Sequence, residues 1–155
     1  MLNSMDFEAL MHLAVEQAKL SGKDVPVGAL LVDREGKVIA SSFNQRENNS
    51  DATSHAEIEV IRGAGKLVGD WRLPDMILVT TLEPCVMCAG AIVAAKIPSV
   101  VFGAWDTKVG AAGSAYDILR DPRLGSPVEV IGGVLESECA SLLQGFFKTE
   151  RKTKQ

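Results

Sequence analysis

Short runs rich in β-forming residues alternate with helical stretches along almost the whole chain. The runs 27–32 and 38–43 flank a polar turn at 33–37, which predicts a hairpin. The segment 6–20 repeats apolar residues with the spacing i, i+3, i+4, i+7 that is typical of an amphipathic helix. This alternation predicts an α/β domain with a mixed central sheet and helices on both faces. The other expected strands are 76–81, 98–103 and 128–134, and the other expected helices are 54–66, 85–96, a short one around 115–119, and 136 to about 152, with a polar loop at 44–53.

The chain is long enough to bury a substantial core without disulfides. It has 155 residues, of which 46% are hydrophobic and 23% are charged, which is typical of one globular domain over 1–155. No apolar run approaches the ~18 to 20 residues that a membrane span needs, and the N-terminal segment lacks the features of a signal peptide. We therefore expect a single-domain, soluble, cytoplasmic protein with no membrane partner.

The net charge of −4 is unevenly distributed along the chain. The last eight residues, which include Lys148, Arg151, Lys152 and Lys154, carry +3, so the first 147 residues carry −7. An acidic body argues against indiscriminate nucleic-acid binding. The basic end of the last helix, at 146–155, has two interpretations: a solvated, frayed helix end, or a local contact with a phosphate backbone.

Two of the three cysteines form a Cys85-x-x-Cys88 pair. An odd number of cysteines without a secretory signal argues against a disulfide framework, so this pair indicates metal or redox chemistry. Pro84 suits the first turn of a helix, which places both sulfurs on one face near the helix N-terminus. The positive end of the helix dipole lowers thiol pKa values and favours the thiolates that bind zinc.

His55 is the obvious third ligand for a metal at this pair, because the other histidine, His12, lies within the amphipathic first helix. Three protein ligands leave the fourth tetrahedral position of zinc for water, as in catalytic rather than structural sites. Such a water is acidified and serves as a nucleophile near neutral pH. Glu57, two residues after His55, is then placed to carry protons.

Each of these features also has a simpler interpretation. Ser54-x-x-Glu57 matches a helix capping box, in which Glu57 would bond to the backbone of Ser54. The cysteine pair could be a redox site, or half of a structural zinc site completed by Cys139 and a histidine. Cys139 taken alone is typical of an inert core thiol, and His12 of a surface or packing histidine.

The two motifs together are more specific than either alone. His-x-Glu at the start of one helix, followed after a strand by Pro-Cys-x-x-Cys at the start of the next, is the pattern of zinc-dependent nucleobase deaminases. The segments 81–91 (TLEPCVMCAGA) and 101–114 (VFGAWDTKVGAAGS) resemble the bacterial tRNA-specific adenosine deaminases of the cytidine and deoxycytidylate deaminase superfamily, and the resemblance extends over nearly the whole chain. It implies a three-layer α/β/α fold with a mixed five-stranded sheet, a homodimer, and conversion of adenosine to inosine at the wobble position of an arginine tRNA.

The resemblance also implies a catalytic mechanism. His55, Cys85 and Cys88 would hold one Zn²⁺ per subunit, and the hydroxide on this metal would attack C6 of the adenine. Glu57 would take the water proton, protonate N1 and later hand a proton to the departing ammonia, without being a metal ligand.

Contacts to the substrate follow from the same resemblance. Asn44 would hydrogen-bond the purine ring, and the Ala56 backbone N–H would face the attacking oxygen. Single-stranded RNA loops are recognised through splayed bases and through phosphates held by basic residues. The expected contacts to the tRNA anticodon stem-loop are Asp106 and Lys108 in the loop after residue 103, and Phe147, Lys148 and Arg151 in the last helix.

Other functions and roles remain open at this point. A free nucleobase or nucleoside deaminase, acting on guanine, cytosine or cytidine, would share the metal site but would not need the basic helix end or the loop with Asp106 and Lys108. A non-catalytic zinc module would need a fourth protein ligand and no role for Glu57. Trp105 stands where many family members carry Arg or another polar residue, and the sequence leaves open both stacking on RNA and packing at a dimer interface.

Overall fold

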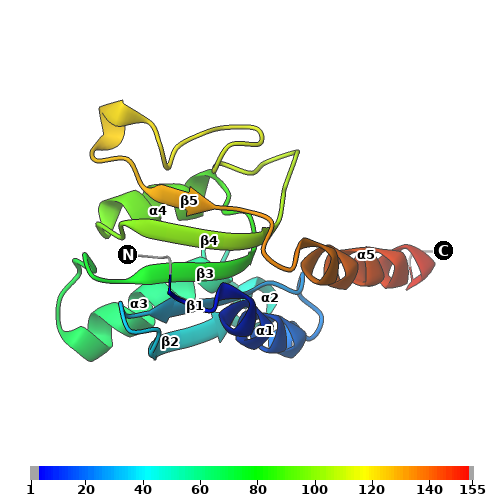
Figure 1. Cartoon of the computed structure of the whole chain (residues 1–155). Coiled ribbons are helices and arrows are strands. Elements are labelled where there is room, and N and C mark those ends of the chain that lie inside the picture. The colour runs from blue at the N-terminus through cyan, green and yellow to red at the C-terminus, as the bar shows by residue number, and fades with distance from the viewer. Residues whose placement is uncertain (1–3, 154–155) are drawn as a thin grey trace.

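The computed structural model describes residues 4–153; residues 1–3 of the N-terminal segment and Lys154 of the basic end lie outside the described residues. A mixed five-stranded sheet forms the middle layer, with strand order β2-β1-β3-β4-β5 (Figure 1). β1 pairs antiparallel with β2 and β3, whereas the pairs β3–β4 and β4–β5 are parallel. The predicted mixed α/β fold is confirmed. The strands are β1 (Gly28–Val32), β2 (Val38–Phe43), β3 (Ile77–Leu82), β4 (Ser99–Ala104) and β5 (Glu129–Ile131).

Helices cover both faces of this sheet (Figure 1). α1 (Phe7–Ala18) and the start of α5 (Glu136–Thr153) pack on one face, and α3 (Ala56–Val68) and α4 (Val86–Ala94) pack on the other. The residues of β1 alternate between the two cores: Ala29 and Leu31 belong to the α3/α4 side, Leu30 and Val32 to the α1/α5 side. A strand that is apolar on both sides is stable only between two covering layers.

The layer formed by α1 approaches β1 very closely at Gly28. A Cβ atom on Gly28 would lie 2.0 Å from the carbonyl oxygen of Ala14 and 2.6 Å from the backbone nitrogen of Ala18. The Gly28 N–H donates a hydrogen bond to Thr81 Oγ1 at 3.1 Å, which ties the start of β1 to β3. Only glycine allows the helix backbone to come this close to the strand.

The prediction of a short helix around 115–119 is wrong. The N–H groups of Ala115 and Tyr116 both donate to the Gly110 carbonyl at 3.0 Å, so this segment folds back onto the preceding loop. Backbone amides used in this way cannot form the i→i−4 bonds of an α-helix. The short helices of the described chain are η1 (Lys19–Ser21), α2 (Arg46–Asn49), which interrupts the polar loop predicted at 44–53, and η2 (Pro122–Leu124).

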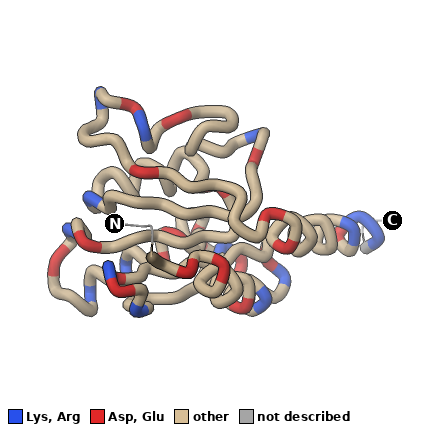
Figure 2. The backbone as a smooth tube through the Cα atoms, in the orientation of Figure 1, with Lys and Arg blue, Asp and Glu red and all other residues tan. Residues whose placement is uncertain are grey.

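α5 begins on the sheet and ends away from it (Figure 1). Cys139 and Leu143 pack toward the sheet, whereas most side chains from Gln144 onward are exposed. The first turn of α5 is acidic and its last turn is basic, which places positive charge at the projecting end (Figure 2). In the described part of the chain, no helix has the length and apolar character that crossing a membrane requires.

Candidate active site

Two helix N-termini meet beyond the end of β3. His55 is the N-cap residue of α3 and Cys85 is the N-cap residue of α4, and neither side chain makes a capping hydrogen bond. Both side chains are therefore available for a ligand rather than for the helix backbone. Cys88, three residues further along α4, faces the same way as Cys85.

These three side chains converge in a geometry that suits zinc. The nitrogen of His55 and the sulfurs of Cys85 and Cys88 all lie within 4.8 Å of one another. His55 Nδ1 is 3.6 Å from Cys85 Sγ and 3.5 Å from Cys88 Sγ. Tetrahedral zinc, with Zn–S near 2.3 Å and Zn–N near 2.0–2.1 Å, places nitrogen and sulfur ligands about 3.6 Å apart. The donor set thus fits zinc, and the role of these residues as ligands stays a prediction.

Hydrogen bonds within the cluster separate the pKa values of its members. The bond with Cys88 is the main cause that lowers the pKa of Cys85 to about 4. The same bond, together with burial, raises the pKa of Cys88. The hydrogen bond with Cys85 raises the pKa of His55. A thiolate beside an imidazole is the kind of environment that attracts a soft cation.

Glu57 lies in the first turn of α3 with only 4% of its surface exposed. Burial raises the pKa of its carboxyl to about 7, against the opposing attraction of His55. The capping-box interpretation is wrong, because the N-cap of α3 is His55 and not Ser54. Ser54 Oγ instead accepts a hydrogen bond from Asn49 Nδ2 at 3.4 Å. A buried carboxyl that titrates near neutral pH can both accept and donate a proton.

A cavity opens onto Glu57 and the cluster, and Asn44, Ala56 and Asp106 are among its walls. Asn44 is held by two hydrogen bonds, from its Nδ2 to the Val25 carbonyl at 3.1 Å and to its Oδ1 from the Arg46 N–H at 3.3 Å. Its amide still has one N–H and one lone pair free for a ligand. The remaining lining residues are Val25, Val27, Arg46, His55, Leu82, Glu83, Cys85 and Val109.

The loop at 105–114 is organised by Glu83, a residue that belongs to neither sequence motif. This carboxylate is 2% exposed. It accepts hydrogen bonds from the backbone N–H groups of Asp106, Ala112 and Ser114, each at 3.0 Å, and from the hydroxyl of Ser114. The sequence does contain an indication of this role: an acidic residue stands directly before Pro84, at the end of a buried strand, where a solvated side chain is not expected.

The predicted RNA contacts do not all gather at the cavity. Asp106 lines it, whereas Lys108 lies on the same loop with its N–H bonded to Asp106 Oδ1 at 3.1 Å. Phe147, Lys148 and Arg151 lie together along the exposed part of α5, in a separate shallow depression. The blue end of α5 in Figure 2 marks this basic surface.

Cys139 is not part of the cluster formed by His55, Cys85 and Cys88. It lies in the core on the α1/α5 side of the sheet, where a Cβ on Gly103 would come within 2.4 Å of its sulfur. Burial raises the pKa of this thiol to about 11, so it is an inert core thiol.

His12 and Trp105 also have partners within the chain. His12 Nδ1 lies 3.4 Å from Glu138 Oε2 in an exposed contact between α1 and α5. The ring of Trp105 packs edge-on against Phe102 with a centroid distance of 4.7 Å and stays half-exposed. Neither residue lines the cavity.

Known proteins are similar to this chain in both sequence and fold. A family model described as the cytidine and deoxycytidylate deaminase zinc-binding region matches residues 5–104. A relative from Bacillus subtilis (strain 168), named tRNA-specific adenosine deaminase, is 43% identical over 150 residues, which cover 96% of this chain and 92% of the relative. A solved structure from studies of A-to-I editing by tRNA:A34 deaminases has a TM-score of 0.83 and 43% identity, covering 87% of this chain and 99% of its own. A guanine deaminase structure from Bacillus subtilis has a TM-score of 0.64 and 38% identity, and covers 71% of each chain.

Proposed function

Because the chain belongs to the cytidine and deoxycytidylate deaminase family, we propose that it converts adenosine to inosine at the wobble position of an arginine tRNA anticodon. One observation carries this proposal: the similarity to a tRNA-specific adenosine deaminase covers 96% of the chain. It therefore continues past residue 104, where the family model ends, into the loop at 105–114 and α5. These are the parts that hold the expected contacts to RNA. The whole chain then acts as one deaminase domain.

His55, Cys85 and Cys88 would hold one zinc ion in each subunit. When bound, zinc supplies a nucleophile at neutral pH by lowering the pKa of water. The N-cap positions of His55 and Cys85 support this role, because neither side chain is used by its own helix.

Glu57 would carry the protons of the reaction. Its buried carboxylate takes one proton from the attacking water and delivers it to N1 of the adenine. Glu57 then takes the remaining proton from the hydroxyl group added to C6 and passes it to the C6 amino group; the C6–N bond breaks, C6 keeps the oxygen as a carbonyl, and ammonia leaves. Glu57 suits this task because it shares the cavity with His55 and Cys85 and is not required as a helix cap.

The cavity would hold the flipped adenine, and the outer surfaces would hold the RNA. Asn44 forms a hydrogen bond with the purine ring, and the Ala56 N–H faces the attacking oxygen. Asp106 and Lys108 line the groove that holds the RNA, and Phe147, Lys148 and Arg151 contact the anticodon stem-loop. The enzyme would work as a homodimer in the cytoplasm, where tRNA is processed.

A free guanine deaminase is the second candidate. The observation that favours it is the guanine deaminase structure with 38% identity over 71% of this chain. A pocket for a flipped base and a pocket for a free base share the same chemistry, so the two functions differ mainly in contacts outside the cavity.

The test is inosine formation in an anticodon stem-loop RNA with an ACG anticodon, measured by mass spectrometry of the digested RNA. Free adenosine, guanine, cytosine and cytidine are assayed in parallel. Glu57→Ala serves as the inactive variant. Glu59→Ala is its matched control, since Glu59 lies on the same helix but points to Arg62. Inosine in the RNA alone, lost only in Glu57→Ala, supports the proposal. Deamination of a free base alone would reject it in favour of the second candidate.

A further inference from the structure

Arg46 and Asp24 form an unusual pair at the wall of the cavity. Asp24 is 2% exposed, and one of its carboxylate oxygens accepts a hydrogen bond from the Glu47 N–H at 2.7 Å. Its other oxygen, Oδ1, is buried without a hydrogen bond and lies 3.8 Å from Arg46 Nε, which is itself buried without one. The carboxylate thus faces one edge of the guanidinium, and the attraction between the two charges holds the side chain in place.

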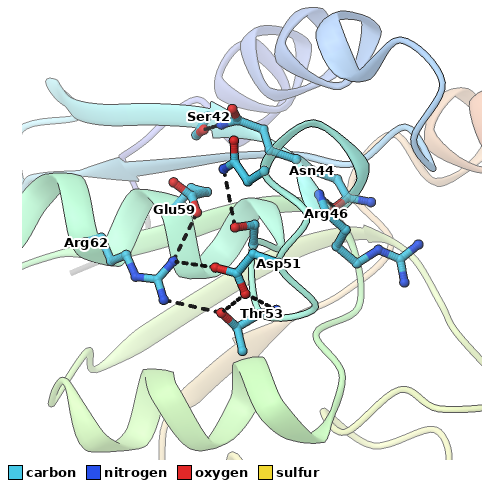
Figure 3. A network of polar contacts seen from close by, with 10 residues as sticks. Ser42, Asn44, Arg46, Asp51, Thr53, Glu59 and Arg62 are labelled. Carbon is cyan, nitrogen blue, oxygen red and sulfur yellow. Dashed lines mark hydrogen bonds and ion pairs between the residues drawn. The ribbon is translucent and has the colours of Figure 1, made fainter.

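The outer edge of the same guanidinium is open. The Arg46 side chain is 40% exposed and lines the cavity that contains His55 and Glu57. Within residues 4–153, each of the other arginines has a hydrogen bond or ion pair at 3.4 Å or less. Figure 3 shows the contrast: Arg62 is enclosed by Asp51, Thr53 and Glu59, while the Arg46 guanidinium points away from this network. Arg46 is therefore held only by its ion pair with Asp24, and among residues 4–153 its two terminal nitrogens have no hydrogen-bond partner.

An anchored guanidinium with a free pair of N–H donors matches the two oxygens of a phosphodiester. We propose that Arg46 binds the phosphate next to the target nucleotide, with Asp24 as the positioning residue that fixes the guanidinium. This inference rests on the proposed function, because a free base has no phosphate. It also explains why a positive side chain lies at the cavity although the first 147 residues have a net charge of −7. Arg46 would hold the backbone on one side while the base enters the cavity.

The test compares Arg46→Gln with Arg34→Gln in deamination of the stem-loop RNA. Arg34 is a matched control: it loses the same charge, but it pairs with Asp75 at 2.8 Å on the turn at the far end of β1. We expect Arg46→Gln to raise KM about ten- to a hundredfold with little change in kcat, since the lost contact is a charge-assisted hydrogen bond. The slope of log KM against log salt should decrease by about 0.7, the value for one phosphate contact in single-stranded RNA. Arg34→Gln should change neither quantity.

Two further arms identify the phosphate and control for folding. A neutral methylphosphonate is placed in turn on each side of the target adenosine. At one of these linkages it should weaken the wild-type reaction as strongly as Arg46→Gln does, and should add nothing in that variant. Arg46→Lys keeps the cation but not the planar donor pair, so it should keep the salt slope and recover only part of the affinity.

An unchanged KM and salt slope in a folded Arg46→Gln variant that still produces inosine would overturn this inference alone. So would a methylphosphonate penalty that persists in Arg46→Gln at both linkages, because the phosphate would then have another partner. Absence of inosine with the wild-type enzyme would instead reject the proposed function, and this inference with it.

Discussion

At the residue scale, Glu57 illustrates how a candidate catalytic side chain departs from local preference. An acid in the first turn of a helix is ordinarily solvated and stabilises the helix dipole. Here it is buried, and its pKa is raised to about 7 because burial disfavours the charged form. Such a group reduces stability in exchange for reactivity, which is a common arrangement in active sites.

Replacement of Glu57 by Gln should therefore separate activity from stability. We expect activity to fall by about 10²- to 10⁴-fold, the usual contribution of a general acid–base group. The free energy of unfolding should rise by about 0.5–2 kcal/mol, because a neutral amide of similar shape is less costly to bury. Thermal unfolding measures the change in stability, and elemental analysis measures the zinc content of the variant. Loss of zinc in Glu57→Gln would contradict the assignment of Glu57 as a non-ligand.

Two glycines give a second prediction at this scale. Gly28→Ala places a methyl group 2.0 Å from the Ala14 carbonyl oxygen, so α1 must move away from β1. We expect this change to destabilise the protein by about 1–3 kcal/mol or more. Gly90→Ala is the control: nothing lies within 4 Å of its Cβ on α4, and replacing glycine within a helix should stabilise it by up to about 1 kcal/mol. Denaturant unfolding measures both, and equal effects would contradict the close packing at Gly28.

At the element scale, Glu83, directly after β3, holds the loop at 105–114 in place through hydrogen bonds to its backbone. We expect Glu83→Gln to loosen this loop, since an amide N–H₂ would face backbone N–H donors that need an acceptor. Hydrogen exchange should accelerate at the amides of Asp106, Ala112 and Ser114, with a loss of about 1–3 kcal/mol in stability. Ser114→Ala, which removes one donor and keeps the carboxylate, should have a smaller effect. Unchanged exchange in Glu83→Gln would show that the loop is held by other contacts.

The helices, strands and loops also differ in how far the sequence could predict them. The buried strands were predictable as short continuous runs of apolar and β-forming residues, and the amphipathic helices because their apolar residues repeat with the helical period. The short helix at 115–119 was not excluded, because the bonds from Ala115 and Tyr116 to Gly110 depend on where the loop is held. The grouping of His55 with Cys85 and Cys88 followed from motif chemistry. The partners of Glu83 and the pairing of Asp24 with Arg46 join residues more than 20 positions apart, which no local pattern encodes.

At the scale of the whole molecule, α5 separates a folded body from a projecting basic end. Deletion of residues 147–155 should change the free energy of unfolding by less than about 1 kcal/mol, because nearly all the side chains described there are exposed. The same deletion should raise KM for the stem-loop RNA at least tenfold by removing Lys148 and Arg151. The double variant Lys148→Gln/Arg151→Gln, which keeps the helix, should reproduce most of this rise. A large drop in melting temperature on deletion would instead place the end of α5 in the core.

The order of the strands also determines when the proposed metal site can form. β1 and β2 are joined by a short turn, so their hairpin needs only local contacts and should form early. The parallel pair β3–β4 requires closure of a much longer segment through α4, and His55 and Cys85 are 30 positions apart. A refolding chain can therefore bind a metal tightly only after contacts between distant parts of the chain are in place. If cobalt(II) replaces zinc, the appearance of its thiolate absorption should follow the far-UV signal of the helices and mark the end of folding.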